Sequence, residues 1–253
     1  MKTALITGAT SGIGREFAKQ LADEGYKLIV TGRRLERLEE LRDSLSVDVE
    51  IIPADLDNEE ACFNFLEAIK DKSIDIFINN AGFGLAGSFL ETDINREISM
   101  IKVNDIAMQI LFKGILQKMA AQGYGYILNV ASSAGLLPGG PYMATYYASK
   151  AYVTSLTRAV RKELKDQACP VRVSALCPGP VDTEFNQNAD VVFALKGISA
   201  EFCVKAAISG MKRNKTIIVP GLIMSIGMAL NHLLPIPLVL SLTGRQQKKK
   251  LYR

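Results

Sequence analysis

The sequence is poor in residues that bind metals or form disulfide bonds. Its 253 residues include one histidine, His232, and four cysteines, Cys62, Cys169, Cys177 and Cys203, none of them spaced as a Cys-x-x-Cys pair. A chain of this length can bury enough apolar surface to fold without disulfides, so we expect reduced thiols in the core. Because no second histidine or cysteine stands at ligand spacing from His232, no metal site is predicted.

The amino terminus lacks the pattern of a signal peptide. Lys2 is followed by a short apolar run, and the sequence then turns at once into the glycine-containing stretch 7–14. That run is too short for the apolar core of a signal peptide, so we expect a cytoplasmic protein.

Carboxylates are absent from the carboxyl-terminal stretch, residues 221–253, which has a charge of +5. The whole chain has a net charge of +4, so the remainder carries 4 − 5 = −1. A basic face with interleaved aromatic residues, typical of nucleic-acid binding, is missing from the body, and no nucleic-acid partner is predicted. The basicity belongs to five cations of the tail: Arg245, Lys248, Lys249, Lys250 and Arg253.

What is present is a regular alternation of short β-rich apolar runs with amphipathic stretches of helical length. Parallel strands need crossover connections, and seven such repeats predict an α/β fold: a single doubly wound Rossmann-type domain with a seven-stranded parallel sheet. We place this domain at residues 1–220 and a carboxyl-terminal apolar, then basic, extension at 221–253. The predicted strands are 4–7, 27–30, 49–52, 74–78, 126–130, 171–176 and 216–219.

A glycine-rich turn joins the first predicted strand to the first helix. Gly8 permits a tight exit from the strand, Gly12 lets the backbone approach a pyrophosphate, and Gly14 allows close helix packing. A helix that begins here presents free N–H groups to an anion. The stretch predicts a dinucleotide-binding loop made by Gly8, Thr10, Ser11, Gly12, Ile13 and Gly14.

The end of the second strand indicates which dinucleotide binds. An NAD site usually has an acid there to hold the ribose 2′-hydroxyl, whereas this strand ends in Arg33 and Arg34. Guanidinium groups can grip a 2′-phosphate, so NADP(H) is the expected cofactor, with Arg33 favoured over Arg34. The alternative is that both arginines begin a solvated helix.

Acid/base residues occur together on the long helical stretch 145–167. Tyr146 and Lys150 are four residues apart and therefore share one helix face. A nearby ammonium should lower the phenol pKa from about 10 by about 1 to 3 units, which would suit Tyr146 to exchange a proton with an alcohol or carbonyl oxygen. Ser133 follows the fifth strand and can donate to the same oxygen. Two neighbours, Ser132 and Tyr147, leave an ambiguity.

Four motifs in this order resemble the short-chain dehydrogenase/reductase family over residues 1–183: the turn 7–14, Asn79-Asn80-Ala81-Gly82, Tyr146-Tyr147-Ala148-Ser149-Lys150, and Pro178-Gly179. The resemblance implies that Ser133 orients the carbonyl, Tyr146 donates or accepts the proton, and Lys150 holds the nicotinamide ribose. It also implies that Asn104 anchors a water leading to bulk solvent. The family's thirteen-residue interval between serine and tyrosine selects Ser133 over Ser132.

The resemblance implies further cofactor contacts and a homodimer or homotetramer. Asp55 and Leu56 would meet the adenine, although Asp55 could instead cap the helix that begins near residue 58. The remaining contacts are Asn80, Ala81 and Gly82 for the adenosine ribose, and Pro178, Gly179, Val181 and Thr183 for the nicotinamide end.

The substrate is less defined. Residues 182–203 resemble the family's variable substrate lid. Apolar residues there and near the site favour a hydrophobic or acyl-type carbonyl. They are Phe185, Val191, Val192, Phe193, Phe83, Leu136, Leu137, Tyr142 and Met143.

The extension 221–253 has three interpretations. Its apolar stretch approaches the length of a membrane span of about 20 residues, but polar residues and two prolines interrupt it. An apolar segment with a cationic end is also typical of peripheral membrane contact. The third interpretation is a helix packed over the active-site mouth or a partner subunit.

These observations predict an NADP(H)-dependent carbonyl reductase or secondary alcohol dehydrogenase acting on a small molecule. Two alternatives from other classes are a non-catalytic NADP(H)-binding or sensor module and a membrane-surface-associated protein that acts through its tail.

Overall fold

The structure is a computed structural model that describes residues 2–184 and 197–251. Most of the predicted lid, including Phe185, Val191, Val192 and Phe193, lies outside the described residues. The side chain of His232 also lies outside them.

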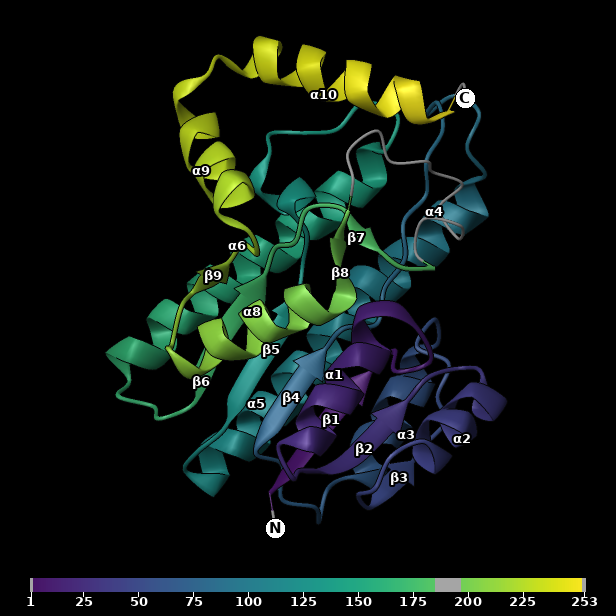
Figure 1. The fold of residues 1–253 in the computed structure, drawn as a ribbon, viewed down its shortest axis with the longest axis vertical. Helices are drawn as coiled ribbons and strands as arrows, with labels where there is room; N and C mark the ends of the chain where they lie inside the picture. Colours follow the sequence, from purple (N-terminus) through teal and green to yellow (C-terminus); the bar gives the residue numbers. More distant parts are fainter. Residues whose placement is uncertain (1, 185–196, 252–253) are drawn as a thin grey trace.

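Seven parallel strands form one sheet in the order β3-β2-β1-β4-β5-β6-β9 (Figure 1), which confirms the predicted fold class. The chain runs outward from β1 to β3 and then returns to place β4 on the other side of β1. The carboxyl ends of β1 and β4 are therefore the switch point of the sheet, the place where doubly wound folds form their ligand crevice. The strands are β1 (Thr3–Thr7), β2 (Lys27–Thr31), β3 (Val49–Ile51), β4 (Ile76–Asn79), β5 (Tyr126–Val130), β6 (Arg172–Leu176) and β9 (Ile217–Ile218).

Helices cover both faces of the sheet. One face packs against α1 (Gly12–Asp23), α2 (Leu35–Asp43) and α8 (Ala200–Lys212). The other face packs against α3 (Glu59–Ala68), α5 (Met108–Gln122) and α6 (Ala144–Asp166). Before α5, α4 (Ile94–Ile101) continues into a π-helix, η1 (Lys102–Ala107); after β5, a 3-10 turn, η2 (Ser133–Leu136), leads toward α6.

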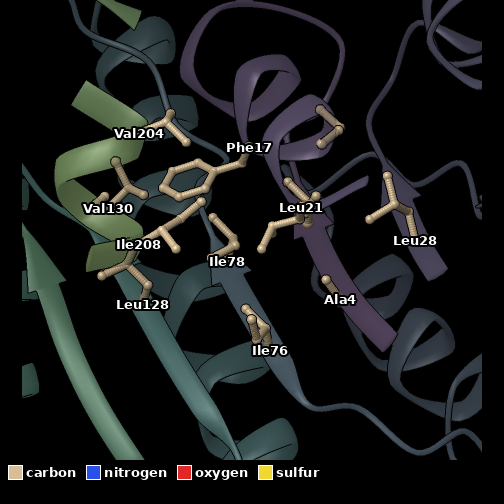
Figure 2. Close-up of a cluster of buried hydrophobic side chains, with 14 of the residues drawn as sticks. Ala4, Phe17, Leu21, Leu28, Ile76, Ile78, Leu128, Val130, Val204 and Ile208 are labelled. Carbon is tan, nitrogen blue, oxygen red and sulfur yellow. The ribbon is translucent and has the colours of Figure 1, made fainter. Parts of the chain in front are cut away.

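Alternate residues of each strand enter different cores. In β1, Ile6 belongs to the cluster beneath α1 and α8, and Leu5 belongs to the cluster on the opposite face. Figure 2 shows the first cluster, in which α1 contributes Phe17 and α8 contributes Ile208. Because strands buried on both faces read as continuous apolar runs, the sequence predicted their positions closely.

The extension folds back along the crevice end of the sheet. It forms α9 (Leu222–Leu230), a 3-10 turn η3 (Asn231–Leu233) and α10 (Ile236–Leu251), with the break at Pro235. In Figure 1, α9 leaves the sheet edge beside β9, and α10 runs across the end toward which the strands point. Across residues 2–184 and 197–251, no helix has the length and apolar character required to cross a bilayer.

Candidate active site

The turn between β1 and α1 is shaped by close backbone approach. Gly8 and Gly12 have φ values of +67° and +52°, a region that other L-residues rarely adopt. A Cβ on Gly14 would lie only 2.2 Å from the carbonyl oxygen of Gly8. Glycine is therefore required at all three positions by the geometry of the turn.

The amino terminus of α1 has no side-chain cap. Its N-cap residue, Ser11, makes no side-chain cap hydrogen bond. By contrast, Asn58, Asp93 and Ser199 cap α3, α4 and α8. Free N–H groups and the helix dipole favour an anion at this position. The turn thus fits the pyrophosphate of a dinucleotide, with Thr10, Ser11, Gly12 and Ile13 around it.

Thr7 and Asn80 tie this turn to the loop after β4. The Thr7 hydroxyl accepts hydrogen bonds from the backbone N–H groups of Asn80 and Ala81, both at 2.9 Å. Asn80 Nδ2 donates to the carbonyl oxygens of Thr7, at 2.9 Å, and Gly8, at 3.2 Å. Asn80 and Ala81 therefore lie beside the turn, and the Asn80 amide braces it. The bracing role of Thr7 was not predicted.

The two arginines after β2 have different surroundings. Arg34 Nη2 donates to Thr10 Oγ1 at 3.2 Å, and its Nη1 lies 3.7 Å from Glu184 Oε2. Glu184 also accepts two hydrogen bonds from Arg37, at 2.8 and 2.7 Å. Arg33 is exposed and, within the described residues, has no ion pair or side-chain hydrogen bond. The Arg33 guanidinium is thus open to an incoming phosphate.

Asp55 lies after β3 and does not cap α3. The cap is Asn58, whose side chain accepts a hydrogen bond from the N–H of Ala61 at 3.2 Å. Asp55 is exposed, and its Oδ1 accepts from the N–H of Asp57 at 3.2 Å. Leu56 is buried beside it. The alternative role for Asp55 as a helix cap is therefore wrong, and its adenine contact stays a prediction.

The Tyr146 phenol is buried among apolar side chains. Burial raises the pKa of Tyr146 to about 12, and a hydrogen bond with the Ser132 side chain opposes that rise. Lys150 Nζ lies over the ring, 5.9 Å from its centroid. The predicted lowering of this pKa by Lys150 is wrong, because burial raises the pKa and the group that opposes the rise is Ser132.

The serine that reaches Tyr146 is Ser132, whereas the family interval selected Ser133. Ser132 Oγ also accepts a hydrogen bond from the N–H of Ala134 at 3.1 Å. Ser133 begins η2, and its own N–H donates to the carbonyl oxygen of Pro178 at 2.8 Å. No side-chain hydrogen bond is made by Ser133 within the described part of the chain. The adjacent serines were the sequence signal for a hydroxyl at this place. The number of residues between serine and tyrosine depends on the length of the loop that follows the serines, so the interval alone does not choose between them.

Lys150 is buried, and its ammonium group is hydrogen-bonded to a strand of the sheet. Its Nζ donates to the carbonyl oxygen of Val130 at 3.1 Å. Burial lowers the pKa of Lys150 to about 8, while the Asp105 carboxylate acts in the opposite direction. The ammonium and the Tyr146 ring therefore share one low-dielectric environment.

Asn104 lies in the π-helix η1, an irregularity that is frequent at functional sites. Its Nδ2 donates to the carbonyl oxygen of Phe83 at 2.9 Å and to Ser149 Oγ at 3.1 Å, and its Oδ1 accepts from the N–H of Phe83 at 3.0 Å. A Cβ on Gly82 would lie 2.8 Å from Asn104 Oδ1 and 3.3 Å from Lys150 Nζ. Asn104, Gly82 and Lys150 thus meet at one point.

Sequence reasoning missed Asp105. Its Oδ1 is buried and has no hydrogen-bond partner in the described structure. Burial raises the pKa of Asp105 to about 6, and the Lys150 ammonium opposes the rise. Its place next to Asn104, a residue predicted at the site, was the available signal.

The segment after β6 passes the mouth of the phosphate turn. A Cβ on Gly12 would lie 3.2 Å from Thr183 Cβ, and one on Gly179 would lie 2.4 Å from Met224 Cε in α9. Val181 is buried in the short strand β7 (Val181–Asp182), which pairs with β8 (Ile198–Ser199). Pro178 accepts a hydrogen bond from the Ser133 N–H, while Thr183 lies beside the phosphate turn. That these residues contact the nicotinamide end stays a prediction.

The helix α10 packs behind Tyr146 and Tyr147. Gln247 Nε2 donates to the Tyr147 hydroxyl at 2.6 Å, and the Tyr147 ring contacts the Tyr146 ring edge-on with 6.3 Å between centroids. A Cβ on Gly244 would lie 3.2 Å from Pro141, in the loop before α6. Of the three interpretations of the extension, this arrangement favours packing against the active site. Met224 and Gln247 were not predicted, because contacts between distant segments leave no local pattern.

A doubly wound sheet, a glycine turn with free helix donors and a buried tyrosine-lysine pair beside it define a Rossmann-type oxidoreductase site. The family model described as short chain dehydrogenase matches residues 2–191. The chain belongs to the short-chain dehydrogenase/reductase family.

Two curated relatives illustrate the likeness. An uncharacterized oxidoreductase of Staphylococcus saprophyticus is 36% identical over 195 residues, which cover 75% of this chain and 82% of that protein. A probable NADP-dependent dehydrogenase of Haemophilus influenzae is 34% identical over 182 residues, 70% of each chain.

Solved structures extend the likeness to nearly the whole chain. A short-chain dehydrogenase from Sphingobium yanoikuyae in complex with NADPH has a TM-score of 0.81 at 29% identity, covering 92% of this chain and 95% of that one. A family member from Burkholderia phymatum in complex with NAD has a TM-score of 0.83 at 26% identity, covering 92% and 93%. The bulky-bulky ketone specific alcohol dehydrogenase from Comamonas testosteroni has a TM-score of 0.77 at 28% identity, covering 92% and 93%.

Proposed function

We propose that the protein is an NADP(H)-dependent oxidoreductase that reduces a ketone to a secondary alcohol or catalyses the reverse oxidation. The observation that carries the proposal is the Tyr146 phenol, bonded to Ser132 beside Lys150, in the crevice next to the phosphate turn. The absence of an acid at the end of β2 and the open guanidinium of Arg33 support NADP(H) over NAD(H). The relative named as NADP-dependent and the neighbour solved with NADPH support the same choice.

When bound, the nicotinamide would supply a hydride to the carbonyl carbon, and the C=O π electrons would move to the oxygen, which becomes an alkoxide. Tyr146 donates its phenol proton to that oxygen, so the O–H bond of the tyrosine breaks as the O–H bond of the alcohol forms. Ser132 orients the oxygen through its hydroxyl. The Lys150 ammonium stabilises the phenolate that remains, and a water near Asn104 returns the proton to Tyr146.

The cofactor would lie along the crevice in an extended arrangement. Its pyrophosphate would meet the turn from Gly8 to Gly14, its 2′-phosphate Arg33 with Arg34, and its nicotinamide ribose Lys150. Adenine would meet Asp55 and Leu56. The remaining contacts would be Asn80, Ala81, Gly82, Pro178, Gly179, Val181 and Thr183.

The surroundings of Tyr146 support a hydrophobic or acyl-type ketone. Met143, Phe83 and Leu137 pack in one apolar cluster with the tyrosine. Leu136 instead packs with the core beneath α5 and α6. A buried apolar wall favours apolar substituents on both sides of a carbonyl, and the solved ketone-specific relative supports this class.

The test is oxidation of NADPH, followed by absorbance, across a panel of ketones with apolar substituents, with NADH in parallel. We expect Tyr146→Phe to lose turnover by at least about a hundredfold, because the proton donor is gone, while still binding NADPH. Arg33→Gln should raise KM for NADPH and leave KM for NADH unchanged.

Tyr124→Phe, a change at an exposed tyrosine, serves as the matched control and should keep full activity. If the wild type binds NADPH but turns over no ketone or acyl thioester, the non-catalytic binding module replaces the proposal. Family resemblance also supports a homodimer or homotetramer, which sedimentation velocity would distinguish from a monomer.

A further inference from the structure

The outer side of α9 is an apolar surface that no other described residue covers. The helix contains no buried residue. Leu222, Ile223, Ile226 and Leu230 are 76%, 90%, 50% and 53% exposed. At about 100° per residue, these four side chains fall within an arc of about 100°. They form a stripe that faces away from the sheet.

The stripe continues along the outer side of α10. Val239 and Gln247 of this helix are buried, and the opposite side carries Leu238 and Leu242 followed by the exposed Arg245 and Lys248. In Figure 1, α9 and α10 form the end of the molecule farthest from the amino terminus. The link between them adds three exposed apolar side chains: Leu233, Leu234 and Ile236.

A basic cavity of about 350 Å³ opens along the other edge of α9. Ser225, Met228 and Ala229 of α9 line one side of it. The lining includes three cations and no carboxylate. These cations are Arg158, Arg213 and Lys215.

Positive charge around this cavity is not neutralised by the described part of the chain. None of the three cations forms an ion pair there, and nearby Arg161 donates to the carbonyl oxygens of Val173 and Asn214, both at 2.6 Å. Burial lowers the pKa of Arg161, and the charge of Arg172 lowers it further. Residues 202–253 contain nine lysines and arginines and no aspartate or glutamate. The apolar stripe is therefore flanked by cations beside α9 and near the end of α10, and none of these forms an ion pair within the described residues.

We propose that this face, the apolar stripe of α9 and α10 with its flanking cations, docks on an anionic membrane surface. Apolar side chains would enter the boundary between headgroups and acyl chains, and the cations would contact lipid phosphates. A second copy of the chain is a poorer occupant, because it would bring two sets of unpaired cations together. Docking requires neither cofactor nor substrate, so the proposal stands or falls separately from the reaction.

The test is flotation of the full-length protein with vesicles. We expect binding to mixed phosphatidylglycerol and phosphatidylcholine vesicles at low salt. Pure phosphatidylcholine or high salt should weaken it by on the order of tenfold. Ile223→Ser with Ile226→Ser should weaken binding to a similar extent, as should Arg213→Gln with Lys215→Gln.

The matched control is Ile94→Ser with Ile98→Ser, which removes two isoleucines of α4 that are 62% and 44% exposed. This pair should keep wild-type binding, and thermal unfolding should show that all variants are folded. The proposal is overturned if the wild type does not float with anionic vesicles, or if the α4 pair weakens binding as much as the α9 pair. Sedimentation velocity showing self-association that the α9 pair abolishes would also overturn it and assign the face to a second copy.

Discussion

Ser132 and Ser133 are adjacent residues, and the Ser132 hydroxyl reaches Tyr146. We expect Ser132→Ala to lower kcat by at least about a hundredfold, because a donor to the reacting oxygen is lost. Ser133→Ala should change kcat by less than about threefold, since its side chain makes no hydrogen bond in the described structure. Steady-state kinetics on the same ketone compares them, and the reverse order would return the role to Ser133.

How far the sequence predicts single residues depends on what sets their spacing. Tyr146 and Lys150 were placed together because helix geometry alone brings residues four apart to one face. The sequence did not decide between the two serines, because loop 137–143 separates them from the tyrosine. This loop contains the Gly139-Gly140 pair, and no periodicity constrains its length. Asp105 escaped notice because burial, not position in the sequence, makes its carboxyl unusual.

At the scale of elements, α10 is joined to helix α6, which carries Tyr146 and Lys150, by the Gln247–Tyr147 hydrogen bond, which spans 100 residues of sequence. Gln247→Ala would leave the buried Tyr147 hydroxyl without this partner, so we expect a loss of about 1 to 2 kcal/mol of unfolding free energy. Urea unfolding would measure it. The neighbouring Gln246→Ala should stay within about 0.5 kcal/mol of wild type.

A double-mutant cycle with Tyr147→Phe separates the hydrogen bond from packing. The sum of the two single losses of unfolding free energy should exceed the loss in the double variant, because each substitution removes the same hydrogen bond. Strictly additive losses would show that the contact contributes nothing to stability.

The strands and helices of the sheet were predictable because each has its own apolar period, whereas the extension was not. Its composition left three interpretations open: a span, a surface helix and a packed helix. The packing of its inner side is set by contacts such as Met224 on Gly179, which depend on where β9 ends in space. Composition located the basic tail, but Arg158, Arg213 and Lys215 converge only when α6, α8 and β9 are assembled.

At the scale of the whole molecule, the buried Lys150 and the partly buried Asp105 make stability depend on pH. The pKa of Asp105 is raised from 3.8 to about 6, so the folded state holds its proton more tightly than the unfolded chain. The contribution of Asp105 to stability is fully present at pH values below its pKa in the unfolded chain. It is lost as pH rises through about 6. The pKa of Lys150 is lowered from 10.5 to about 8, so its contribution is present at high pH and is lost as pH falls through about 8.

Asp105→Asn should remove the first dependence. We expect its melting temperature to rise relative to wild type as pH increases from about 4 to about 7, because only wild type must ionise a buried carboxyl. Loss of the carboxylate should also move the Lys150 transition to lower pH, since Asp105 raises the pKa of Lys150. Circular dichroism melts from about pH 4 to about pH 10 would cover both transitions. The exposed Asp71→Asn is a control that should follow wild type. Parallel curves for Asp105→Asn and wild type would show that Asp105 is not the group whose ionisation the fold opposes.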